Sequence, residues 1–272
     1  AIGQAIAAGK APGAVVRIES GRAVYQKTFG DKAAKPERSP MTADTIFDAA
    51  SLTKVIATAP AIALLIEQGK LGLDDRVEKW IPGFKKNGKG AVTIRHLLTH
   101  TSGLRPGLSP RPEWSGVATA IAKAKAEPLT EQPDTKFIYS DINFILLGEI
   151  VRLVSGERLD LFVSKNIFQP LGMNDTGFLP PLAKRSRVAP TEQVGEVILH
   201  GEVHDPTARR MGGVAGHAGL FTTAADLGRF ANMMLNDGSL DGRRVFKKET
   251  VKWMTASHTK PPMKIKRGLG RD

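Results

Sequence analysis

The chain has 272 residues, of which 41% are hydrophobic and 24% are charged, and it contains no cysteine. This length and composition predict a folded protein with a sizeable core, and the lack of thiols excludes disulfides, a cysteine nucleophile and a zinc–thiolate site. The net charge of +12 suits an anionic partner. The basic residues are scattered, however, and no nucleic-acid motif accompanies them, so we expect no specific nucleic-acid partner. Attraction to an anionic cell-wall polymer or to acidic lipid headgroups would use the same positive field without specific contacts.

The longest apolar stretch covers residues 55 to 66 and is interrupted by Thr58 and Pro60. It is shorter than the ~20 residues that cross a bilayer, so we expect a buried helix and no transmembrane segment. The sequence begins at Ala1 rather than at a methionine, which fits either a removed signal peptide or a trimmed start. A periplasmic or extracellular location is therefore favoured over a cytoplasmic one.

The N-terminal residues predict a helix followed by a β-hairpin. Residues 2 to 8 form a short helical pattern that Gly9 closes. Residues 14 to 18 and 23 to 29 favour strands, and Ser20-Gly21 between them is typical of a hairpin turn.

A helical pattern begins at Ser51 and ends at Gly69, with Pro60 expected to kink it because proline has no N–H to donate. Further helices are expected at residues 93–99, 116–126, 141–153, 159–166, 224–235 and 247–254. Strands at the front followed by helices predict an α+β fold. We expect a single catalytic unit, with an α/β lobe that starts at residues 1–50, a mainly helical lobe at 51–235, and a helix and tail at 236–272.

The predicted sheet is incomplete. A two-stranded hairpin is marginally stable in water, and nothing after Met254 has a strand pattern. We therefore expect either that a second polypeptide completes the sheet, or that the sequence is a fragment or a cut form that ends before its last strands.

Ser51 and Lys54 form a Ser-x-x-Lys motif at the start of the apolar helix, where the spacing places both side chains on one face. A serine hydroxyl is a poor nucleophile until a nearby base accepts its proton, and a lysine can be that base when burial and neighbours lower its pKa. The spacing recurs at Ser257 and Lys260, in a proline-rich tail where nothing would activate the serine. The alternative for any such motif is a capping serine beside a solvated lysine.

Other candidate residues lie further along the chain. Tyr139 stands at a loop-to-helix junction, where its phenol could enter a cleft as a general base; otherwise it is a packed aromatic, with Asp141 a mere N-cap. His217 lies in the glycine-rich segment 212–219 and could reach a ligand or serve as a structural hydrogen-bonding residue.

His96 and His100 have the i, i+4 spacing of a metal site. No glutamate follows His96, so the metalloprotease pattern is absent. We expect these histidines to join their helix to the loop at residues 101–103, and we expect no metal and no cofactor.

Four segments occur in an order that resembles the β-lactamase-related serine hydrolases, which include class C β-lactamases, D-Ala-D-Ala carboxypeptidases and esterases of similar fold. They are residues 47–54, 93–104, 139–144 and 216–221. The resemblance implies the β-lactamase and penicillin-binding-protein fold and a small ester or amide substrate, including β-lactams and peptidoglycan-like molecules. It also implies acylation of Ser51, proton transfers shared by Lys54 and Tyr139, and substrate contacts from Asp141, His217 and Gly219.

The chain departs from this family at two places. Family members often have Asn where Asp141 stands; an ionised carboxylate cannot donate a hydrogen bond and repels an anionic β-lactam, so an esterase is favoured. The alternatives are a β-lactamase or carboxypeptidase, and a non-catalytic member that binds peptidoglycan-like ligands or a partner. The family's third motif, Lys or His before Thr or Ser and Gly on a strand facing the serine, has no counterpart after residue 219. The resemblance thus implies missing C-terminal strands and weak activity of the chain alone.

Overall fold

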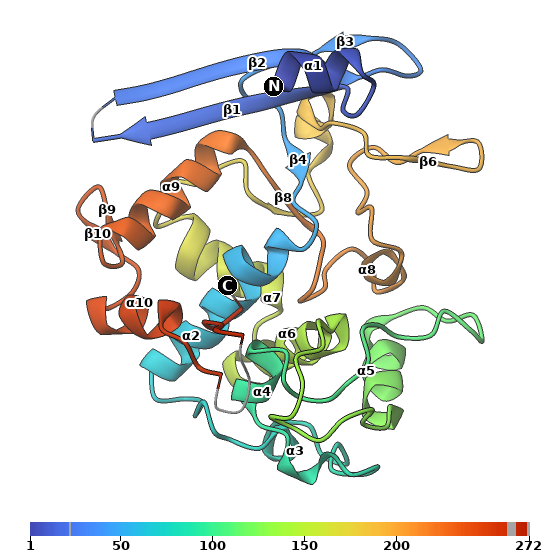
Figure 1. The fold of residues 1–272 in the computed structure, drawn as a ribbon, viewed down its shortest axis with the longest axis vertical. Coiled ribbons are helices and arrows are strands. Elements are labelled where there is room, and N and C mark those ends of the chain that lie inside the picture. Colours follow the sequence, from blue (N-terminus) through green and yellow to red (C-terminus); the bar gives the residue numbers. More distant parts are fainter. Residues whose placement is uncertain (22, 260–264, 271–272) are drawn as a thin grey trace.

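An antiparallel sheet formed by the N-terminal residues lies across one end of the molecule (Figure 1). The computed structural model describes residues 1–21, 23–259 and 265–270. Strand β1 (Gly13–Ser20) pairs with β2 (Ala23–Ala33), and β3 (Ser39–Pro40) continues the sheet on the far side of β2. Ser20 is opposite Ala23 in the register of the two strands, and the predicted hairpin is confirmed.

The hairpin gains cover from two helices. Helix α1 (Ile2–Ala7) contacts β2, and α9 (Ala224–Leu235) contacts β1 (Figure 1). Together with β3, this cover supplies the burial that a bare hairpin lacks. Among the described residues, no strand pairs with the outer edge of β1.

The prediction that strands gather only at the front of the chain is wrong. Strand β8 (Leu220–Thr222) lies between β4 (Phe47–Asp48) and β5 (Gly177–Phe178), and both pair with it in the antiparallel direction. Two short hairpins are also present, formed by β6 (Gln193–Val194) with β7 (Val197–Ile198) and by β9 (Ser239–Leu240) with β10 (Arg243–Arg244). Strands of two or three residues are too short to show a period-two pattern, which explains why the sequence did not reveal them.

The helix expected from Ser51 changes type along its length. Residues Lys54–Thr58 form the π-helical segment η1, which continues into α2 (Ala59–Glu67). Pro60 stands in the first turn of α2, where a missing N–H removes no hydrogen bond of that helix. The π-helical segment ends at Thr58, two residues before Pro60, and the kink expected at Pro60 stays a prediction.

The other predicted helices are confirmed within a few residues. They are α4 (Ile94–Leu98), α5 (Val117–Ala126), α6 (Asp141–Ser155), α7 (Leu159–Val163) with η3 (Ser164–Phe168), α9 and α10 (Lys248–Thr255). Four short helices were not expected, namely α3 (Val77–Trp80), η2 (Lys89–Ala91), η4 (Leu182–Arg187) and α8 (Pro206–Arg210). Within the described ranges, no helix combines the length and apolar character that spanning a bilayer requires.

Helix α6 is the centre of the hydrophobic core. It contacts α2, α4, α5 and α7, so residues such as Phe144 and Ile145 are buried on several of its faces. The buried cluster extends from Ile46, before β4, to Leu269, near the end of the described chain. Because η1 and the start of α6 both border this core, side chains at these two places can meet.

Candidate active site

The turn that carries Ser51 is held in a strained shape. Ala50, directly before it, has φ 45°, a left-handed value that costs energy for a residue with a side chain. Asp48 at the end of β4 accepts the Ala50 N–H at 2.8 Å, and the Thr53 hydroxyl donates to the Ala50 carbonyl at 2.6 Å. These contacts fix the turn, and they leave Ser51 exposed just before η1.

Lys54 is the buried centre of the site. Its side chain is 2% exposed, and its Nζ lies 3.0 Å from Ser51 Oγ, 3.0 Å from the His217 carbonyl oxygen and 2.7 Å from Asp141 Oδ1. An ammonium so deeply buried is tolerated only when it is paired and hydrogen-bonded, and these three contacts meet that need. The structure therefore brings Ser51 and Lys54 into direct contact.

Tyr139 lies beside the same lysine. Lys54 Nζ is 4.9 Å from the centroid of its ring, and the ring stacks on His100 at 4.5 Å between centroids. The Tyr139 side chain remains partly open to the cavity described below. The Tyr139 ring, the Lys54 ammonium and the Ser51 hydroxyl thus belong to the lining of one cavity.

His100 supports the loop that carries Tyr139. Burial, together with the positive charges of Arg267 and Lys54, lowers the pKa of His100 to about 3, so its imidazole is neutral. The Nδ1 atom accepts the Ser140 N–H at 3.0 Å. The expectation that His100 joins its helix to residues 101–103 is therefore wrong for this ring, because the ring faces the segment before α6.

His96 has a separate structural role. Its Nδ1 accepts the Thr93 N–H at 3.0 Å at the start of α4, and its Nε2 lies 3.1 Å from Asp134 Oδ2. Since the rings of His96 and His100 serve different neighbours, their i, i+4 spacing does not create a shared site.

The sequence leaves open that Asp141 is only an N-cap, and the structure shows that this alternative is wrong. The N-cap of α6 is Ser140, which makes no capping hydrogen bond with its side chain, and Asp141 is the first helical residue. Its carboxylate instead pairs with the Lys54 ammonium, and its side chain is about one-third exposed. A carboxylate in this place offsets the charge of the buried lysine.

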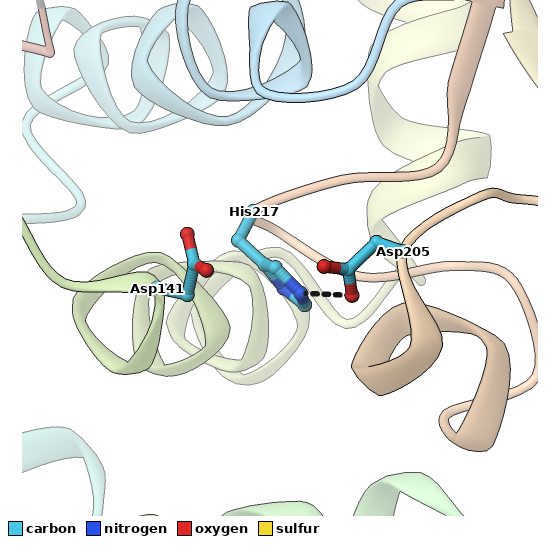
Figure 2. Close-up of side chains that lie close together, drawn as sticks. All are labelled: Asp141, Asp205 and His217. Carbon is cyan, nitrogen blue, oxygen red and sulfur yellow. Dashed lines mark hydrogen bonds and ion pairs between the residues drawn. The ribbon is translucent and has the colours of Figure 1, made fainter. Parts of the chain in front are cut away.

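The sequence did not reveal Asp205, which holds the ring of His217 (Figure 2). His217 Nε2 lies 2.9 Å from Asp205 Oδ1, and the ring is 1% exposed. Burial raises the pKa of the Asp205 carboxyl, but the hydrogen bond and charge of His217 and the backbone N–H groups of α8 outweigh it and lower the pKa to about 2. The available signal was Asp205-Pro206, a capping residue followed by a proline at a helix start.

Gly219 lies where the backbone leaves little choice of residue. Its φ is 110°, and a Cβ there would collide with the carbonyl oxygen of Gly213. This glycine lets the segment turn from His217 into β8. Its contact with substrate stays a prediction, as does that of His217.

The carboxylates of Asp141 and Asp205 and the imidazole of His217 offer ligand atoms within 4.8 Å of one another (Figure 2). Such a group could in principle hold a metal ion. The Lys54 ammonium, however, already lies 2.7 Å from Asp141 Oδ1. The cation of this cluster is therefore a side chain of the protein itself, and a second cation would meet its repulsion.

A cavity of about 610 Å³ opens beside Ser51. Its polar side is formed by Ser51, Lys54, His100, Tyr139 and Arg267. The remaining wall is mostly apolar and is contributed by η1, α9 and the last described residues: Val55, Ile56, Phe230, Ala231, Met234, Leu235 and Gly270. The hydroxyl of Ser51 thus faces a space large enough for a small substrate.

The family model described as Beta-lactamase matches residues 1–271. The chain belongs to this family. It is 36% identical over 280 residues to a protein of Escherichia coli (strain K12), and the match covers 88% of this chain and 63% of the relative. That relative carries the name of a D-alanyl-D-alanine carboxypeptidase, an activity that the name gives as an assignment and not as an established fact. It is 34% identical over 287 residues to the N-acetylmuramyl-L-alanine amidase of Bacillus subtilis (strain 168), covering 92% and 65%.

Solved structures agree with the family. The octameric penicillin-binding protein homologue from Pyrococcus abyssi superposes with a TM-score of 0.80 at 28% identity, over 98% of this chain and 62% of that one. The predicted family and the β-lactamase and penicillin-binding-protein fold are thus confirmed. The chain spans about 63% of the length of its curated relative from Escherichia coli. The family is one of serine hydrolases, and proteins similar to this chain are named as carboxypeptidases, esterases and β-lactamases.

Proposed function

We propose that this chain is a serine hydrolase that forms an acyl-enzyme on Ser51. The observation that carries the proposal is the 3.0 Å contact between Ser51 Oγ and Lys54 Nζ at the mouth of a cavity. A hydroxyl in hydrogen-bonding distance of a buried amine can transfer its proton as it attacks a carbonyl carbon.

In the proposed reaction, Lys54 first releases a proton to solvent and reacts as the neutral amine. Ser51 Oγ then bonds to the substrate carbonyl carbon while its proton passes to Lys54 Nζ, and Tyr139 shares in this transfer. The bond from that carbon to the leaving group then breaks, and the same two residues return the proton to the departing oxygen or nitrogen. A water molecule repeats the sequence on the acyl-enzyme and releases Ser51. Asp141 offsets the positive charge that Lys54 carries in these steps.

An ester with an uncharged acyl group is the first candidate substrate. Much of the cavity wall is apolar, and the partly exposed Asp141 carboxylate beside Lys54 disfavours an anionic group next to the scissile bond. Esters are also more reactive than amides toward a serine nucleophile, which lowers the demand on the site.

A cell-wall peptide is the second candidate. The two relatives described above carry the names of enzymes that cleave peptidoglycan-type amide bonds, and the net charge of +12 suits an anionic polymer. Arg267 on the cavity wall could pair with a peptide carboxylate. This candidate differs from the first in requiring a charged substrate.

We further propose that full activity needs a strand on the outer edge of β1. That edge is unpaired within the described part of the chain, and the relatives are longer. The strand would come from a longer form of the chain or from a second polypeptide. Pairing would also provide hydrogen-bond partners for the backbone N–H and C=O groups along that edge of β1.

The test is covalent labelling with a fluorophosphonate, followed by mass spectrometry of the peptide that contains Ser51. We expect labelling at Ser51, and turnover of p-nitrophenyl esters in preference to nitrocefin or a D-Ala-D-Ala peptide. A folded protein that is not labelled at Ser51 would refute the acyl-enzyme. Labelling together with preferential cleavage of the peptide would replace the first substrate candidate with the second.

A further inference from the structure

We propose that Asp205 is a positioning residue for Lys54 and that it acts through His217. The inference rests on the proposed function, because it concerns how the base of Ser51 is held. The polar groups within hydrogen-bonding distance of the Lys54 ammonium include one main-chain oxygen, that of His217, at 3.0 Å. A contact that holds the His217 carbonyl in place therefore also helps to hold the Lys54 ammonium in place.

The segment around His217 passes between two helices. Thr58 of η1 donates its hydroxyl to the Gly216 carbonyl at 2.7 Å, and a Cβ on Gly216 would collide with the Phe144 carbonyl of α6. Gly216 is therefore needed for the close approach. The carbonyls of Gly216 and His217 both meet the helix that follows Ser51, at Thr58 and at Lys54.

Glycines on both sides leave this segment with little stiffness of its own. Gly212 and Gly213 have φ values of 85° and 86°, and Gly219 has 110°. Because glycine gives the backbone wide freedom, the direction of the His217 carbonyl depends on its contacts rather than on local sterics. The hydrogen bond from the ring to Asp205 is such a contact, since ring and carbonyl belong to the same residue.

Contacts within the protein hold Asp205 in place without a substrate. Its Oδ1 accepts the Ala208 N–H at 2.7 Å as the N-cap of α8. The preceding residue, His204, donates its N–H to Asp48 Oδ2 at 2.7 Å, and the other oxygen of Asp48 accepts from Ala50. The same carboxylate thus links the turn before Ser51 to the loop that carries Asp205.

These contacts form a closed path around the nucleophile. One branch runs from Asp48 through Ala50 to Ser51, and the other runs through His204, Asp205 and His217 to Lys54. The positions of the Ser51 hydroxyl and the Lys54 amine therefore both depend on contacts that start at the Asp48 carboxylate. Such a frame maintains the 3.0 Å contact between them without a direct role for Asp205 in the chemistry.

The experiment measures the rate and concentration dependence of fluorophosphonate labelling at Ser51, per folded protein. For Asp205→Ala we expect the maximal labelling rate to fall by about 100-fold, because a displacement near 1 Å costs that much. The concentration for half-maximal rate should stay unchanged, since Asp205 does not line the cavity. Asp205→Asn keeps an oxygen acceptor for His217 and Ala208, so it should stay within about threefold of the unmodified protein.

Asp226→Ala is the matched control. Asp226 is a buried carboxylate that, like Asp205, accepts a backbone N–H, here from Asp175 at 2.9 Å. It also accepts a hydroxyl hydrogen bond from Thr176, but it lies in α9. It should lower the melting temperature and leave the labelling rate of the folded protein unchanged. An unchanged rate in Asp205→Ala, or an equal loss in Asp205→Asn, would overturn the positioning role. An unmodified protein without any label would instead refute the acyl-enzyme itself.

Discussion

The two Ser-x-x-Lys segments of this chain share their spacing and differ in their surroundings. Ser51 is exposed at the mouth of a cavity, while its partner Lys54 is buried among three polar contacts. Ser257 is exposed in the tail, with the Thr259 hydroxyl 3.2 Å from its own, and Lys260 lies outside the described residues. A buried, paired amine beside an accessible hydroxyl therefore distinguishes a candidate nucleophile from a motif that merely recurs in the sequence.

We expect the largest effect when the serine of each Ser-x-x-Lys segment is replaced in turn. Ser51→Ala removes the attacking oxygen, so labelling and ester turnover should fall by at least about 10³-fold. Ser257→Ala should leave both unchanged, because its hydroxyl has no buried amine nearby among the described residues. Rates from purified, folded variants provide the measurement. Equal losses at the two serines would show that burial does not distinguish them.

The second prediction concerns a variant in which the Lys54 side chain is replaced by an uncharged side chain of similar volume. Lys54→Met eliminates the proton acceptor and leaves the Asp141 carboxylate without its ion pair, so the labelling rate should fall by about 10²- to 10⁴-fold. Lys252→Met changes an exposed lysine of α10, near the second motif, and serves as the control. Labelling that survives in Lys54→Met would assign the proton transfer to another group.

The third prediction concerns the close approach behind Lys54. Gly216→Ala forces a methyl group against the Phe144 carbonyl oxygen, so we expect a loss of about 1–3 kcal/mol in the free energy of unfolding. Labelling should slow as well, since the segment also carries the His217 carbonyl. Gly107→Ala places its methyl in open space and should change neither quantity. Urea denaturation measures the first effect, and a normal stability for Gly216→Ala would contradict the tight packing.

The smallest effect is a pH dependence that comes from His100. Its folded pKa of about 3 is below the ordinary value of 6.5, so the unfolded chain binds a proton first as the pH falls. The neutral ring therefore contributes stability above pH 6.5 that is progressively lost between about pH 6.5 and 3. His100→Gln, which cannot be protonated, should weaken this dependence.

The half-exposed His204 offers a comparison for that measurement. Denaturation midpoints of His204→Gln should follow those of the unmodified protein from pH 7 to 4. If His100→Gln behaved in the same way, the neutral, buried state of His100 would be contradicted.

Local patterns in the sequence determined several features of this protein. The hairpin of β1 and β2 follows from two β-favouring runs that flank Ser20-Gly21, and α6 ends at Gly156 because that residue adopts a left-handed φ of 76°. The pairing of Ser51 with Lys54 also depends on residues only three apart. In each case the interacting groups are close in the chain, so their spacing alone predicts the contact.

The residues that surround these features are brought together by tertiary contacts, and local sequence patterns do not predict them. The Lys54 ammonium meets the carbonyl of a residue 163 positions away in the sequence. Strand β8, which follows that residue, pairs with β4 and β5, and both strands are also distant from β8 in the sequence. Asp205, His217 and Asp141 belong to different elements, and no periodic pattern relates them. Their meeting follows from the packing of η1 against α6 and from the glycines that let a loop pass between them, since close approach in space leaves no spacing rule in the sequence.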